Sequence, residues 1–249
     1  MVGLIIIGDE ILNGRRTDKH LPAVIELLSK RHIPLSWVRY IPDNLHVIAE
    51  NLRYAYSLDY PVFSCGGIGG TPDDMTRAAA AMAANVDVVI HPQAQEILTE
   101  KFGIEHLNAN RLKMIEFPYG STLIENPVNG IPGFKFRNVY FVPGFPEMAH
   151  PMLESLVQEG EFTRLAIPNY KVKSLLVDSV KESDLLPIML SLVEKYPELK
   201  FSSLPSFGNQ IYQFPHIDLS FSGNYKLVNQ AIAELEEYLV EHNYKIIIR

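Results

Sequence analysis

Short apolar runs alternate with amphipathic helical segments along the first two-thirds of the chain. The first apolar run spans 2–7, and a segment with apolar residues three or four positions apart follows at 21–28. This spacing is typical of a helix with one buried face, whereas an unbroken apolar run is typical of a strand that is covered on both sides. The alternation predicts an α/β fold, a mostly parallel sheet with helices on both faces.

The same alternation continues to about residue 142. Asn44 precedes a helical pattern and is a favoured residue type for a helix N-cap. Further strands are expected at 34–41, 61–65, 86–90 and 139–142, and further helices at 72–84, 92–102 and 108–116.

The order of elements changes past about residue 168. A strand at 172–179, a helix at 183–195, two strands within 199–221, a helix at 225–241 and a strand at 244–248 give the order β-α-β-β-α-β. A segment with this order can close into a two-layer α+β unit by itself. We therefore expect two domains, 1–167 and 168–249.

Composition and charge argue against several classes of protein. The net charge of −7 provides no broad basic surface for nucleic acid or anionic membranes. The single cysteine, Cys65, cannot form an intramolecular disulfide, and the apolar start of the chain lacks the flanking pattern of a signal peptide. These features predict a cytoplasmic protein without nucleic-acid or membrane partners.

A glycine-rich segment follows the third expected strand. Backbone amides in such a turn can approach a phosphate group without interference from side chains. The segment is not a Walker A loop, because it lacks Gly-Lys-Ser/Thr, and it lacks the third glycine of a dinucleotide fingerprint. A purely structural alternative is that Thr71 and Asp74 cap the next helix, although a cap does not explain the glycines before it. These glycines are Gly66, Gly67, Gly69 and Gly70.

Several ordered motifs resemble one family. Gly66-Gly67-Ile68-Gly69, followed by Asp74 and Thr76, is similar to the signature of the MoaB/Mog-type molybdopterin-binding domain. The opening Gly8-Asp9-Glu10-Ile11-Leu12-x-Gly14 is similar to that of the CinA branch (competence/damage-inducible protein A). Further matches are Asp43-Asn44, Asn110-Arg111, Pro118-x-Gly120-Ser121, Asn126-Pro127, Pro132-Gly133-Phe134 and Pro143-Gly144-Phe145-Pro146-Glu147-Met148. The resemblance covers about 1–160, and 168–249 is similar to the small KH-like unit of CinA proteins.

The resemblance implies a pocket for the phosphates of a nucleotide or a pterin at the glycine loop. Asp43 and Asp74 match the functional aspartates of the family and are the expected catalytic residues. The other expected ligand contacts are Thr71, Thr76, Arg77, Asn110, Arg111, Pro143, Gly144 and Glu147. CinA proteins often carry a further deamidase domain, and we expect that activity to be absent from this chain.

Carboxylates beside a phosphate could hold a divalent cation such as Mg²⁺, which would also bind the phosphate oxygens. The candidate metal ligands are Asp9, Glu10, Asp43 and Asp74. Basic side chains would balance the remaining negative charge of the ligand. The candidates are Arg77, Arg111 and Lys113, and a second group formed by Arg15, Arg16 and Lys19. Each of these residues also has a structural interpretation, as a helix cap or as part of a solvated surface.

Three functions stay open at this point. The first is metal-dependent hydrolysis of a nucleotide pyrophosphate, as in an ADP-ribose pyrophosphatase. The second is binding or adenylylation of molybdopterin in molybdenum cofactor biosynthesis. The third is a ligand-binding or assembly protein without turnover, favoured by departures from the usual CinA pattern at Gly70 and Pro72. Because related domains self-associate, we also expect a homodimer or homotrimer.

Overall fold

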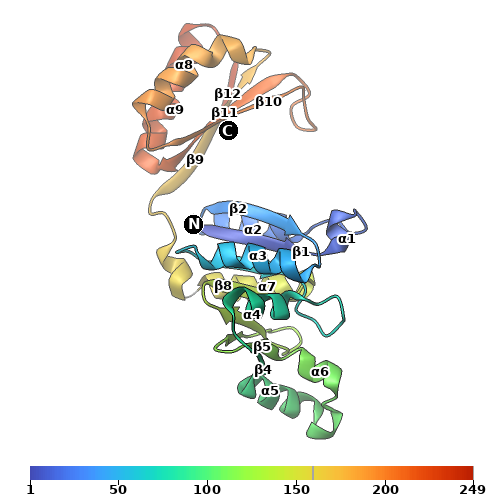
Figure 1. The fold of residues 1–249 in the computed structure, drawn as a ribbon. Helices are drawn as coiled ribbons and strands as arrows, with labels where there is room; N and C mark the ends of the chain where they lie inside the picture. The colour runs from blue at the N-terminus through green and yellow to red at the C-terminus, as the bar shows by residue number, and fades with distance from the viewer. Residues whose placement is uncertain (159, 249) are drawn as a thin grey trace. The chain divides into compact units, whose positions relative to one another are not determined.

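The computed structural model describes residues 1–158 and 160–248 of the chain. These residues form two compact units, 1–166 and 167–249, each with its own sheet and its own apolar core (Figure 1). The sequence pattern placed the boundary between 167 and 168. Among the described residues, no helix combines the length and the apolar character needed to cross a bilayer.

A six-stranded sheet forms the middle of the first unit, with the strand order β2-β1-β3-β8-β7-β6. The first four strands in this order are parallel, and β7 and β6 are antiparallel to their neighbours. The mostly parallel sheet expected from the alternation is therefore confirmed. The strands are β1 (Val2–Ile7), β2 (Leu35–Ile41), β3 (Val62–Cys65), β6 (Thr122–Ile124), β7 (Gly133–Phe136) and β8 (Val139–Val142).

Helices cover both faces of this sheet (Figure 1). Successive side chains of a strand point to opposite faces, so Leu4 and Ile6 of β1 pack with α2 and α7, whereas Ile5 and Ile7 share a core with α3 and α4. All four side chains are buried, which explains why this strand is apolar throughout. These helices are α2 (His20–Ser29), α3 (Leu45–Tyr56), α4 (Thr76–Ala84) and α7 (Pro146–Gln158), and the short α1 (Asp9–Leu12) follows β1.

The strand expected at 86–90 does not join the parallel sheet. It is β4 (Val88–Ile90), which pairs antiparallel with β5 (Glu116–Pro118) in a separate two-stranded sheet. The segment between the two strands contains α5 (Pro92–Phe102), the 3-10 helix η1 (Ile104–His106) and α6 (Ala109–Lys113). Three strands, β5, β6 and β7, have no counterpart in the sequence prediction.

Helix α4 begins later than expected. The sequence predicts a helix from 72 with Thr71 as its N-cap, but the helix begins at Thr76. Residues 71–74 instead form a turn in which the Asp74 amide donates to the Thr71 carbonyl at 3.1 Å. The expected cap of α3 is confirmed, because the Asn44 side chain accepts hydrogen bonds from the amides of His46 and Val47.

The second unit has the predicted order β-α-β-β-α-β. Its four strands form an antiparallel sheet in the order β10-β11-β9-β12, and both helices pack into one apolar core with this sheet. The elements are β9 (Tyr170–Asp178), α8 (Glu182–Lys195), β10 (Lys200–Ser206), β11 (His216–Asn224), α9 (Tyr225–Glu241) and β12 (Ile246–Ile248). A short 3-10 helix, η2 (Gly160–Arg164), closes the first unit.

Candidate functional site

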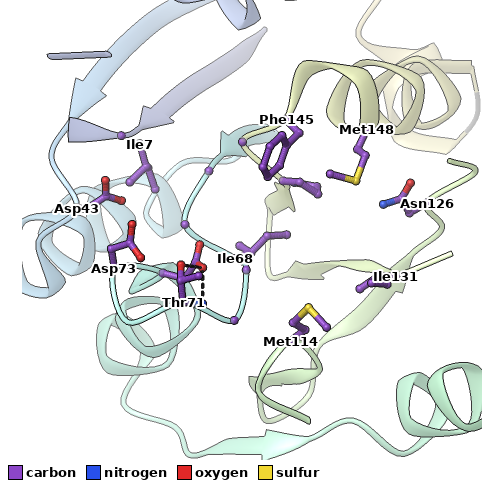
Figure 2. Close-up of a pocket in the computed structure, with 18 of the residues that line it drawn as sticks. Ile7, Asp43, Ile68, Thr71, Asp73, Met114, Asn126, Ile131, Phe145 and Met148 are labelled. Atoms are coloured by element: carbon purple, nitrogen blue, oxygen red, sulfur yellow. Dashed lines mark hydrogen bonds between the residues drawn. The ribbon is translucent and has the colours of Figure 1, made fainter. Parts of the chain in front are cut away.

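A cavity of about 400 Å³ lies at the carboxyl ends of the central parallel strands (Figure 2). The residues that follow β1, β3 and β8 line it, and so does Asp43, which follows β2. Open α/β sheets bind their ligands at this edge, and the volume is within the range of small-molecule sites. The expected site residues in the lining are Glu10, Asp43, Gly66, Gly67, Gly69, Gly70, Thr71, Asp74, Pro143 and Gly144.

The glycine loop has a backbone path that requires glycine. Gly66 and Gly67 have φ values of +109° and +69°. A Cβ atom at Gly66 would overlap the Ile7 carbonyl oxygen, and one at Gly67 would overlap the Thr76 hydroxyl. Thr76 is buried, and its hydroxyl donates to the Gly66 carbonyl at 3.0 Å. Thr76 therefore shapes the loop from behind and does not line the cavity.

Carboxylates are concentrated on one side of the cavity. Glu10, Asp43, Asp73 and Asp74 all line it, and the Asp43 carboxylate accepts a hydrogen bond from the Asp9 amide at 2.9 Å. Partial burial raises the pKa of Asp43, and the negative charges of Asp9, Glu10 and Asp73 raise it further, although the Asp9 amide opposes the shift. This side of the cavity consequently favours a positively charged or cation-bearing ligand.

The four predicted metal ligands do not form a complete metal centre by themselves. Within 1–158 and 160–248, no group of three or more His, Cys, Asp or Glu side chains is placed to hold an ion. Asp9 contributes its amide to Asp43, and its side chain is not part of the lining. Asp74 accepts hydrogen bonds from both the Thr71 amide (2.8 Å) and the Thr71 hydroxyl (2.5 Å), so its carboxylate holds the turn at the edge of the cavity.

The opposite side of the cavity is apolar. Figure 2 shows Ile68, Met114, Ile131, Phe145 and Met148 around it, across from Asp43 and Asp73. The Phe145 side chain is 53% exposed, so an aromatic face is available to a ligand. Flat apolar and thioether surfaces of this kind suit a planar heterocycle.

The first unit of the chain matches a known protein family over nearly its whole length. Residues 3–161 match the model described as a probable molybdopterin binding domain. The chain belongs to this family. The resemblance to its CinA branch is confirmed by two relatives, a CinA-like protein from Citrifermentans bemidjiense and the protein CinA of unknown function from Thermoplasma acidophilum.

The relatives match the chain to different extents. The C. bemidjiense protein is 28% identical over 80% of this chain and 52% of its own length. Protein Ta0487 from T. acidophilum is 27% identical over 96% of this chain and 95% of its own length. The crystal structure of T. acidophilum CinA has a TM-score of 0.59 and 29% identity, and the match covers 63% of this chain and 95% of that one.

Several of the expected ligand contacts and metal ligands lie outside the cavity lining. Besides Asp9 and Thr76, these are Arg77, Asn110, Arg111 and Glu147. The Arg77 guanidinium is buried, which lowers its pKa, and its Nη1 atom has no hydrogen-bond partner among the described residues. Arg111 donates to the His106 carbonyl at 2.7 Å and packs on the Phe102 ring, so it does not supply a cation to the cavity.

One of the basic side chains expected to balance the charge of the ligand is in the lining, and several other lining residues had no assigned role. Arg16 lines the cavity, and its guanidinium carbon lies 5.9 Å from the centre of the Phe145 ring. Phe145, Met148 and Asn126 belong to motifs that the sequence matched to the family, so a signal for them existed. These residue types do not indicate phosphate or metal chemistry, for which charged residues and glycines are typical.

A buried histidine supports the wall of the cavity. His20 is 4% exposed, and its Nε2 atom lies 3.2 Å from the carbonyl oxygen of Gly144, to which it donates. Burial lowers the pKa of His20 and the charge of a protonated His150 lowers it too, while the hydrogen bond to Gly144 and the charges of Asp18 and Glu147 oppose the shift. The folded protein therefore keeps His20 neutral at a pH where the unfolded chain protonates it.

We expect this histidine to make stability depend on pH. As the pH falls below the ordinary histidine value of 6.5, the unfolded chain takes up a proton that folded His20 does not, so the free energy of unfolding decreases. His20→Gln should show a smaller decrease between pH 7.5 and pH 5.5 than the wild type, measured by urea denaturation. His46→Gln, at an exposed histidine, is the control and should behave as the wild type. Equal pH dependence of His20→Gln and wild type would contradict the assignment.

Proposed function

We propose that this chain binds a nucleotide pyrophosphate such as ADP-ribose in the cavity and hydrolyses it with the help of a divalent cation. The proposal rests on the two chemically different sides of the cavity. Glycine-loop backbone and carboxylates lie on one side, and an apolar wall with an exposed aromatic face lies on the other (Figure 2). A phosphorylated heterocycle has the same two parts.

The glycine loop would hold the phosphates. The positive φ angles of Gly66 and Gly67 and the absence of side chains bring the loop backbone close to any ligand in the cavity. Arg16 lines the same cavity and could bind a phosphate oxygen. These contacts would bind and orient the pyrophosphate.

The carboxylates fit a cation that is shared with the ligand. Mg²⁺ is usually held by one or two protein carboxylates together with substrate phosphates and water, so a site with three or more protein ligands is not required. Asp43 and Glu10 are the best placed, because both line the cavity and the Asp74 carboxylate is already bonded to Thr71. When bound, the cation would polarise the phosphorus and lower the pKa of a water molecule.

A second candidate is molybdopterin binding, with or without adenylylation. The family's own description favours it, and a pterin phosphate would fit the same division of the cavity. Binding without turnover is the third possibility. The hydrogen bonds from Thr71 to the Asp74 carboxylate favour binding without turnover, because this carboxylate then stabilises the turn and does not contact the ligand.

The activity assay separates these candidates. We expect purified protein, incubated with ADP-ribose and Mg²⁺, Mn²⁺ or Co²⁺, to release AMP, detected by chromatography. The matched control is the same reaction with EDTA. No AMP with any of the three ions would refute hydrolysis of ADP-ribose. Tight retention of molybdopterin without product would support the second candidate, and a ligand-induced rise in Tm without product would support the third.

A further inference from the structure

Asn126 carries a hydrogen-bond donor that has no partner. The residue lines the cavity and is only 3% exposed. Its Nδ2 atom is buried and makes no hydrogen bond within the described part of the chain. Figure 2 shows this nitrogen on the edge of the amide that faces Met148 and the cavity. A buried donor without an acceptor destabilises the folded protein, so a hydrogen-bond partner for this nitrogen is expected.

The orientation of the Asn126 amide follows from its other contacts. Its Oδ1 atom accepts hydrogen bonds from the amides of Val128 (3.1 Å) and Asn129 (3.5 Å). If the side-chain nitrogen and oxygen of Asn126 were exchanged, its NH2 group would face the N–H groups of Val128 and Asn129, and a donor facing two donors is unfavourable. The atom directed into the cavity is therefore a donor and not an acceptor.

The neighbouring side chains do not supply the missing acceptor. Asn129 uses its own oxygen to accept from the Ile131 amide at 2.9 Å, and its nitrogen donates to the Met148 sulfur at 3.0 Å. The surrounding wall is formed by Met148, Ile131 and Phe145. The carboxylates that could accept a hydrogen bond lie on the other side of the cavity (Figure 2). No described residue accepts a hydrogen bond from Asn126 Nδ2, so this donor is available to a ligand in the cavity.

We propose that Asn126 determines which heterocycle the cavity accepts, by donating from Nδ2 to a carbonyl oxygen or an unprotonated ring nitrogen on the edge of the ring. The inference rests on the proposed function, since it assigns the ring of the phosphorylated ligand to the apolar side. Phe145, Met114 and Met148 contact the faces of the ring, and Asn126 donates a hydrogen bond to an acceptor on its edge. Oxo-pteridines and purines both carry such an acceptor, whereas an unsubstituted hydrocarbon ring does not.

The test uses Asn126→Asp with two ligands that differ only by the ring. Aspartate keeps an oxygen for the Val128 and Asn129 amides but replaces the donor with an acceptor. We expect calorimetry with Mg²⁺ to give AMP a Kd that is about tenfold to a hundredfold higher in the variant. Ribose 5-phosphate should bind both proteins equally. Asn108→Asp, at an asparagine that likewise accepts a backbone hydrogen bond but lies outside the lining, should bind both ligands as the wild type does.

A second measurement needs no variant. The adenine ring of AMP has three acceptor nitrogens outside the glycosidic bond, and the 1-deaza, 3-deaza and 7-deaza analogues remove one each. We expect one analogue to bind the wild type about tenfold more weakly than AMP. Equal binding of all three analogues and AMP would overturn the inference, and so would an equal loss of AMP and ribose 5-phosphate in Asn126→Asp. AMP release from ADP-ribose by a wild type that binds AMP no better than ribose 5-phosphate would overturn the ring subsite alone and leave the proposed hydrolysis standing.

Discussion

Asp43→Asn is expected to lower the rate of AMP release by on the order of a hundredfold or more, because it removes a carboxylate that would hold the divalent cation against the phosphates. The fold should be preserved. The asparagine side chain has an oxygen that can accept the hydrogen bond from the Asp9 amide in the same position. The rate is measured at saturating ADP-ribose and Mg²⁺, and a rate within a few-fold of the wild type would contradict the role given to this carboxylate.

The same substitution should slightly stabilise the protein at neutral pH. Burial and the charges of Asp9, Glu10 and Asp73 raise the pKa of Asp43, so the folded state resists the ionised form. Above the raised pKa, the ionised Asp43 carboxylate destabilises the folded wild type to the full extent. Below the ordinary value of 3.8, the carboxyl is protonated in both states and this destabilisation is absent. We expect the Tm of Asp43→Asn to exceed that of the wild type by about one to two degrees at pH 8, a small effect because Asp43 is partly solvated.

The excess Tm of Asp43→Asn should disappear as the pH falls through the raised pKa. The matched control is Asp87→Asn at an exposed aspartate outside the cavity, which should change neither the rate nor the Tm. Loss of activity together with a large fall in Tm would mean that Asp43 acts through the fold instead of through its charge.

Gly66→Ala is expected to have the largest effect on stability, a loss of about 3 kcal/mol or more in the free energy of unfolding. Two costs combine at this position. The φ of +109° disfavours any residue with a Cβ atom, and that atom would overlap the carbonyl oxygen of Ile7, which belongs to the central strand β1. The backbone must move to relieve the overlap, so binding of phosphorylated ligands should be lost as well.

Gly120→Ala is the control for this second prediction. Gly120 has a φ of +89°, but a Cβ atom there would meet no other atom within 4 Å. The variant should lose only the backbone preference, about 1 kcal/mol. Both losses are measured by urea denaturation. If the two variants lose the same amount, the close approach between the glycine loop and β1 has no energetic consequence.

Most of the fold could be predicted from the sequence because its strong elements are long and periodic. The fully apolar β1 and the helix that Asn44 caps follow local rules that the tertiary structure does not override. Strands β5, β6 and β7 were missed because they are short and contain polar residues, glycine or proline, whereas the equally short β4 and β8 are wholly apolar. The late start of α4 was missed for another reason. The Thr71 and Asp74 pair that imitates a helix cap closes a turn instead.

The candidate site could be predicted only in part. Motifs placed the glycine loop, Glu10 and Asp43, which indeed line one cavity. They also included Arg111, although its guanidinium packs on Phe102, because a motif specifies a position in the chain and not the direction of a side chain. The unpaired donor of Asn126 depends on every group around it. No spacing in the sequence could reveal it.

One contact of the glycine loop limits how this sequence can diverge. The Thr76 hydroxyl occupies the space that a side chain at position 67 would need, and it donates to the carbonyl of Gly66. A lineage that replaced Gly67 would first have to shrink Thr76, and that earlier step would sacrifice the hydroxyl. A change at Gly67 alone creates the overlap and a change at Thr76 alone removes the hydrogen bond, so we expect substitutions at these two positions to be coupled.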